Sequence, residues 1–145
     1  MLSQRTRYAL RSLIMLAGGS ADAPQQIATI SATERVPRKF LELILLDLKR
    51  AGIVESTRGR SGGYRLARAA KDISFGEVIR LLDGPLALVP CASLTAYAPC
   101  GDCQDEVTCA IRRAALVVRE ESARVLDGFS LADAVRREAN AIAAL

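Results

Sequence analysis

Residues 37–68, PRKFLELILLDLKRAGIVESTRGRSGGYRLAR, decide the fold predicted for this chain. The first half places apolar side chains at helical spacing, which predicts an amphipathic helix beginning at Pro37 and ending at Gly52. The residues of this apolar stripe are Phe40, Leu41, Ile44, Leu45 and Leu48. A short helix is expected over residues 25–36, and two short helices joined by a turn form a helix-turn-helix.

The second half of the stretch predicts a β-hairpin. Two short strands are expected at 53–54 and 64–66, because both contain residues that favour strands and the loop between them is rich in glycine. A hairpin that follows a helix-turn-helix is a wing. The expected fold class is therefore mainly α, a winged helix-turn-helix with a two-stranded wing.

Helical patterns continue on both sides of this unit. Helices are expected over 3–18 and over 74–83, a long amphipathic helix from Cys109, and a last helix from Ser130. We expect three parts: a winged-helix domain over 1–84, a cysteine-rich loop over 85–108 as a candidate effector site, and a long helix with a C-terminal helix over 109–145.

Charge is unevenly distributed along the 145 residues. The formal net charge is +4, but residues 1–72 carry +7 and residues 73–145 carry −3. A basic half predicts a polyanionic partner, double-stranded DNA in this context. No signal peptide or membrane-spanning segment is recognisable, so we expect a cytoplasmic protein without a membrane partner.

Three groups of residues are candidates for DNA contact. The start of the second helix of the helix-turn-helix offers Arg38, Lys39 and Glu42 for base contacts, and Glu42 could instead pair with Arg38 or Lys39. Arg58, Gly59 and Arg60 form the wing tip, where two adjacent cations suit the DNA backbone or minor groove. Arg5 and Arg7 are expected to contact phosphates near the first helix.

Catalytic motifs are absent from the sequence. The chain has no histidine, no serine elbow and no glycine-rich phosphate loop that follows a strand. We therefore expect a protein that is not an enzyme.

All four cysteines lie in one polar stretch, at Cys91, Cys100, Cys103 and Cys109. Their spacing is compatible with an iron–sulfur cluster, an all-cysteine zinc site or a thiol–disulfide switch. Zinc sites usually combine two Cys-x2-Cys pairs, whereas this chain has one. Four unrelated cysteines are a further reading, and the spacing alone leaves these alternatives open.

Several segments together resemble the Rrf-two family of bacterial winged-helix regulators, which includes IscR-type and NsrR-type proteins. The resemblance rests on RYAL near the start, FLELILLDLKRAGIVESTRGRSGGYRLAR, DISFGEVIRLLDG and the cysteines that follow. It implies a homodimeric DNA-binding transcription regulator. It also implies that the helix from Pro37 is the recognition helix, that Arg58 enters the minor groove, and that the helix from Cys109 forms the dimer.

The resemblance further implies an iron–sulfur cluster on cysteines that precede the dimerisation helix. Relatives use three cysteines and a histidine or aspartate, but Arg112 and Arg7 stand at the matching positions here. Cys100 is the surplus thiol and a candidate fourth ligand. The expected cofactor is thus a cluster, with a 2Fe–2S type favoured. Zinc, a thiol–disulfide switch without metal, and a winged helix that binds protein instead of DNA are the alternatives.

Overall fold

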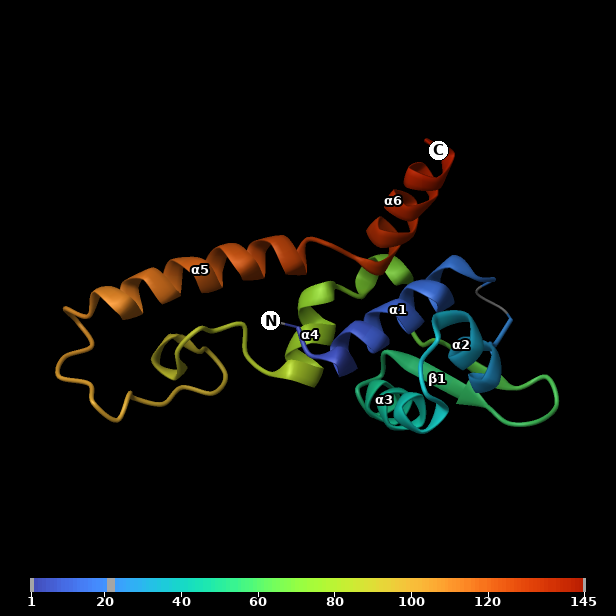
Figure 1. Cartoon of the computed structure of the whole chain (residues 1–145), viewed down its shortest axis with the longest axis horizontal. Coiled ribbons are helices and arrows are strands. Elements are labelled where there is room, and N and C mark those ends of the chain that lie inside the picture. The colour runs from blue at the N-terminus through green and yellow to red at the C-terminus, as the bar shows by residue number, and fades with distance from the viewer. Residues whose placement is uncertain (1, 21–22, 145) are drawn as a thin grey trace.

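The computed structural model describes residues 2–20 and 23–144 and confirms a mainly helical winged-helix fold (Figure 1). The helices are α1 (Gln4–Gly18), α2 (Ile27–Glu34), α3 (Arg38–Arg50), α4 (Phe75–Asp83), α5 (Ala110–Asp127) and α6 (Leu131–Ala143). The hairpin consists of β1 (Val54–Thr57) and β2 (Gly63–Leu66), and two short 3-10 helices are η1 (Ala70–Asp72) and η2 (Pro90–Ala92).

Helix α3 packs one face into the core. Its four buried side chains are fully shielded from solvent: Leu41, Ile44, Leu45 and Leu48. Phe40 was expected on this stripe but is 51% exposed, because a step of one residue turns a side chain by about 100° around the helix. Pro37 lies immediately before the helix as its N-cap, and the helix ends two residues before Gly52.

The wing is an antiparallel hairpin whose register runs from Val54 opposite Leu66 to Thr57 opposite Gly63. The loop that precedes α2 extends this sheet by one rung, since Gln25 and Tyr64 exchange two backbone hydrogen bonds of 2.8 Å. Gly63 lies at this crossing with a φ of 151°, and a Cβ there would come within 2.4 Å of the Gln25 carbonyl oxygen. The junction therefore requires glycine.

The C-terminal helix returns to the winged-helix body. The Phe75 amide donates to the Phe129 carbonyl at 2.9 Å, and the Leu131 amide donates to the Ile73 carbonyl at 3.0 Å. Leu131 is fully buried in the same core as the α3 leucines. Helix α6, which follows α5 in the sequence, thus packs against α1 and η1.

Helix α5 projects from the body as a long arm, with the cysteine segment at its far end (Figure 1). The wing lies at the opposite end of the molecule. Across residues 2–20 and 23–144, no helix has the length and apolar character needed to span a membrane.

Candidate DNA interface and cysteine centre

The first turns of α3 present the predicted base-contacting residues to solvent. Arg38, Lys39 and Glu42 are all exposed. The Arg38 Nε atom lies 3.2 Å from the Glu42 Oε1 atom, so Glu42 pairs with Arg38 in the DNA-free chain. Exposed ion pairs of this type contribute little free energy. The pair can therefore open without a large cost.

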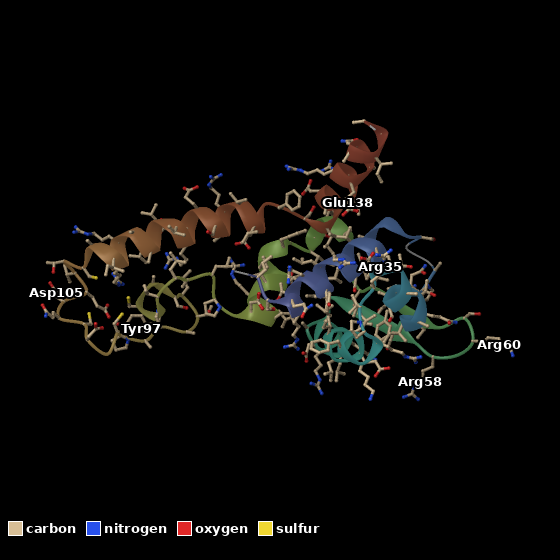
Figure 2. The ribbon with its side chains drawn as sticks, viewed as in Figure 1. Arg35, Arg58, Arg60, Tyr97, Asp105 and Glu138 are labelled. Atoms are coloured by element: carbon tan, nitrogen blue, oxygen red, sulfur yellow. The ribbon has the colours of Figure 1, made fainter. Side chains whose placement is uncertain are left out.

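The wing tip carries Arg58 and Arg60, whose side chains extend away from the protein (Figure 2). Among the described residues, neither guanidinium forms an ion pair. Gly59 between them has a φ of 107°, and its carbonyl accepts from the Gly62 amide at 3.0 Å. The turn therefore presents two uncompensated cations at the edge of the molecule.

The two arginines predicted at the start of α1 differ in their surroundings. Arg5 pairs with Asp47 of α3, so it joins α1 to α3. Arg7 is exposed. Arg5 would have to exchange its aspartate partner to bind a phosphate, whereas Arg7 faces solvent directly.

The four cysteines line one cavity of about 350 Å³. Cys91 lies in η2 and is 4% exposed, while Cys109 is the N-cap of α5. Cys100 and Cys103 lie at the two ends of one turn, which is closed by a 3.2 Å hydrogen bond from the Cys103 amide to the Cys100 carbonyl. The predicted clustering of the thiols is thus present in the folded chain.

All four thiols are free, and two of them are in contact. The Cys100 Sγ atom lies 3.9 Å from the Cys91 Sγ atom. The Cys109 Sγ atom accepts a hydrogen bond from the Arg112 amide at 3.4 Å. Within the described parts of the chain, no set of three or more cysteine, histidine, aspartate or glutamate side chains converges closely enough to hold a metal ion.

The cavity favours the protonated form of two cysteines. Partial desolvation raises the pKa of Cys103, and the carboxylate of Glu106 and the neighbouring Cys109 raise it further. The hydrogen bond to Cys91 raises the pKa of Cys100. Both thiols therefore favour the neutral form in the metal-free chain.

Two arginines of α5 hold the backbone around Cys91. Arg119 is 14% exposed and donates from Nη1 to the Ala92 carbonyl at 2.8 Å. Arg112 donates from Nε to the Cys91 carbonyl at 3.2 Å and lies 3.6 Å from Glu106. This role was not predicted from the sequence, although a spacing of seven residues places both arginines on one helix face.

Polar side chains on the rim hold the rest of the cysteine segment (Figure 2). The Tyr97 hydroxyl donates a hydrogen bond to Glu106. This bond joins the segment before the turn at residues 100–103 to the segment after it. Asp105 accepts from the Thr108 hydroxyl at 2.7 Å and from the Val107 amide at 2.9 Å. The Thr108 hydrogen bond, with help from Val107, lowers the pKa of Asp105.

Comparison with known proteins identifies the family. The model of the Rrf2 family, described as an iron-dependent transcriptional regulator, matches residues 2–137. The chain belongs to the Rrf2 family. The resemblance found in the sequence, there called Rrf-two, is confirmed.

Individual relatives agree with this assignment. The rrf2-like protein of Rhodobacter capsulatus is 46% identical over 139 residues, covering 92% of this chain and 91% of that protein. The HTH-type transcriptional regulator NsrR of Geobacillus kaustophilus is 33% identical and covers 96% and 92%. The structure of CymR, the global cysteine regulator of B. subtilis, superposes with a TM-score of 0.78 at 29% identity, covering 94% and 97%. Rrf2 proteins are transcriptional regulators and not enzymes.

Proposed function

We propose that this Rrf2-family chain is a homodimeric regulator that binds double-stranded DNA and carries an iron–sulfur cluster on Cys91, Cys100, Cys103 and Cys109. The observation that carries the cofactor proposal is the position of Cys100. Its sulfur shares a cavity with the other three and lies 3.9 Å from that of Cys91. Cys100 would thus be the fourth ligand, in place of the histidine or aspartate that the family resemblance implies.

The donor types suit a cluster, because four thiols line one cavity. The described thiols do not yet converge on one centre, so binding would require the cysteine segment to close around the cluster. Two thiolates on one tetrahedral metal ion, each about 2.3 Å from it, lie about 3.8 Å apart, close to the separation of the Cys91 and Cys100 sulfurs. Four thiolates complete the protein ligands of a 2Fe–2S cluster, the type we favour, or of a 4Fe–4S cluster. When bound, such a cluster supplies a redox-active group whose behaviour depends on nearby hydrogen bonds and solvent access.

Residues of α5 connect the cysteine segment to the winged helix. Arg112 and Arg119 fix the backbone of residues 91–92 against one end of the helix. At the other end, Arg80 of α4 donates two hydrogen bonds to Asp127, at 2.6 and 2.8 Å. A change in the cysteine segment therefore reaches α4, and with it the DNA-binding body, through one rigid helix.

The outer face of α5 supports dimerisation. Ile111 is 71% exposed, Val118 is 45% exposed and Val125 is 57% exposed. These residues, with Ala114, recur at helical spacing on the side away from Arg112 and Arg119. An exposed apolar stripe on a projecting helix suits pairing with the same helix of a second chain. Two paired chains would set the separation of their recognition helices and hence the half-site spacing on DNA.

Metal analysis of anaerobically purified protein tests the cofactor proposal. We expect iron and acid-labile sulfide in equal amounts, with visible absorption that is lost in each of the four Cys→Ser variants. Gln104→Ala is the matched control, because Gln104 lines the same cavity without a thiol. A colourless protein with one zinc per chain would contradict the cluster and establish the zinc alternative. An unchanged cofactor in Cys100→Ser would exclude Cys100 as a ligand.

A thiol–disulfide switch is the second candidate, favoured by the same contact between Cys91 and Cys100. Their sulfurs would have to approach from 3.9 Å to about 2.05 Å. Mass spectrometry after treatment of metal-free protein with a thiol oxidant tests this candidate. A Cys91–Cys100 disulfide, combined with the absence of iron in the anaerobic protein, would support the switch over the cluster.

Charge reversal at the wing tip tests the DNA interface. In Arg58→Glu and Arg60→Glu we expect at least about a tenfold loss of duplex affinity and a salt dependence reduced by about one unit for each lost phosphate contact. Lys71→Glu, an exposed residue of η1, is the control for charge alone. Unchanged affinity in both wing variants would remove the wing from the DNA interface and favour a protein-binding winged helix.

A further inference from the structure

Two leucines on the recognition helix face solvent instead of the core. Leu43 is 61% exposed and Leu46 is 41% exposed. The hydrophobic effect favours burial of such side chains, so their exposure in the isolated chain is a cost unless a partner covers them. Their position on α3 identifies the type of partner.

The leucines lie at the centre of the exposed face. Lys39, Leu43, Leu46 and Arg50 follow one another at intervals of four, three and four residues, so they form one straight stripe along the helix. The fully buried residues of α3 occupy the opposite side. A cation thus stands at each end of a short apolar segment.

The charge around the leucines favours DNA over an apolar protein or membrane partner. Arg38, Lys39 and Arg50 are exposed around them; Arg38 pairs with Glu42 and Arg50 lies 3.7 Å from Asp47. Lys39 forms no ion pair among the described residues, and the wing adds the unpaired cations Arg58 and Arg60 (Figure 2). A polyanion that also offers apolar groups fits this pattern. In the major groove, the 5-methyl group of thymine is the apolar feature of the base edges.

We propose that Leu43 and Leu46 determine part of the operator sequence by contacting thymine methyl groups in the major groove. This inference rests on the proposed DNA-binding role of α3. Lys39 and Arg50, at the ends of the stripe, are positioned to bind phosphates while the leucines approach the bases. Each half-site is expected to contain at least one thymine that is recognised through its methyl group.

Replacement of thymine by uracil tests the inference, because it removes the methyl group alone. A duplex is first enriched from a randomised library with the wild-type protein, and each thymine is then replaced by deoxyuracil. We expect the wild type to lose about fourfold in affinity at each contacted methyl. Leu43→Ala or Leu46→Ala should bind the thymine and uracil duplexes equally well at the corresponding position.

Two variants serve as controls. Phe40→Ala removes an exposed apolar side chain that lies off the stripe, and it should retain the uracil penalty. Leu43→Met keeps an apolar side chain and should also retain it. Thermal melting followed by circular dichroism establishes that each variant is folded.

The outcomes separate this inference from the proposed function. If no duplex is enriched, DNA binding itself fails. If a duplex is enriched but uracil substitution leaves wild-type affinity unchanged at every position, methyl recognition is overturned and DNA binding stands. If Leu43→Ala or Leu46→Ala instead changes the mass of the assembly in sedimentation, the leucines form a protein contact and the inference is also overturned.

Discussion

At the scale of single residues, glycines with positive φ differ in how much a side chain at their position would destabilise the fold. Gly63 and Gly52 both adopt conformations that favour glycine, with φ of 151° and 71°. At Gly63 a Cβ would also collide with the backbone of Gln25, whereas at Gly52 nothing lies within 4 Å. A comparison of alanine substitutions at the two positions therefore separates the cost of backbone strain from the cost of steric overlap.

We expect Gly63→Ala to lower the free energy of unfolding by roughly 2–4 kcal/mol, because strain and overlap combine at the wing. Gly52→Ala, the matched control, should cost about 1–2 kcal/mol, since strain acts there alone. Denaturant unfolding measures both. Equal decreases in the free energy of unfolding of the two variants would contradict the close approach of the Gln25 backbone to Gly63.

Arg119 is one of two arginines that support the backbone around Cys91. Arg119→Met keeps the length of the side chain but removes its hydrogen bond to the Ala92 carbonyl. We expect faster hydrogen exchange at the amides of Ala92 and Ser93, which are hydrogen-bonded within η2. Arg113→Met, an exposed change on the same helix, is the control. Unchanged exchange in Arg119→Met would exclude Arg119 as the support of η2.

At the scale of elements, caps and ion pairs decide how helices join the body. Gly76 of α4 lies so close to Asp127 that a Cβ there would meet the carboxylate at 2.0 Å. The absence of a side chain at Gly76 thus gives room for the Arg80–Asp127 pair. This pair lowers the pKa of Asp127, mainly through the Arg80 hydrogen bond.

The cap of α6 is sensitive to acid. The Ser130 hydroxyl and amide both donate to Asp133, and the hydroxyl, followed by the amide, lowers the Asp133 pKa from its ordinary 3.8 to about 2. Because the folded pKa is the lower one, the stabilisation is complete above about pH 4 and is lost as the pH falls through about 2. Unfolding free energy should therefore decline over this range.

Asp133→Asn should weaken that decline, as measured by denaturant unfolding between pH 5 and about pH 2. Glu138→Gln, an exposed acidic residue on the same helix (Figure 2), is the control and should leave the decline as in the wild type. An identical pH dependence in Asp133→Asn and the wild type would contradict the assigned cap.

The order of the elements could be predicted from the sequence, because apolar periodicity, caps and glycine positions are local signals. The helix-turn-helix, the wing and the cap of α6 at Ser130 follow this rule. The exposure of Phe40 follows from local helical geometry, because its side chain lies about 100° around the helix from that of Leu41, although the apolar pattern alone placed it on the stripe. The arginine support of η2 could not be predicted, because it depends on where α5 meets a segment far along the chain, which no local pattern encodes. Contact between the Cys91 and Cys100 sulfurs depends on the same long-range placement.

At the scale of the whole molecule, the exposed apolar face of α5 is the proposed dimer interface. A charge at Val118, near the middle of the exposed stripe, should prevent dimerisation because burial would desolvate it. We expect Val118→Glu to be monomeric in analytical ultracentrifugation and to lose most of its DNA affinity. Arg113→Glu introduces the same side chain on a different exposed position of α5 and should remain dimeric. A dimeric Val118→Glu variant would place the interface elsewhere.

The two proposed functional regions lie at opposite ends of the molecule. The cysteine segment lies at the far end of α5, and the wing lies at the other end of the molecule (Figure 1). In the proposed mechanism, the state of the thiols is transmitted through α5 and the partner chain to the DNA-binding surface. Such coupling between sites typically changes affinity by about 5–150-fold.

The most direct test is the affinity of anaerobically purified dimer for its enriched duplex, measured at one salt concentration before and after cofactor removal. The account predicts a change of at least about fivefold in wild-type protein. Cys100→Ser, which should lack the cofactor from the start, should show no change on the same treatment. Equal affinity of wild-type protein in both states would contradict the claim that the cysteine centre controls DNA binding.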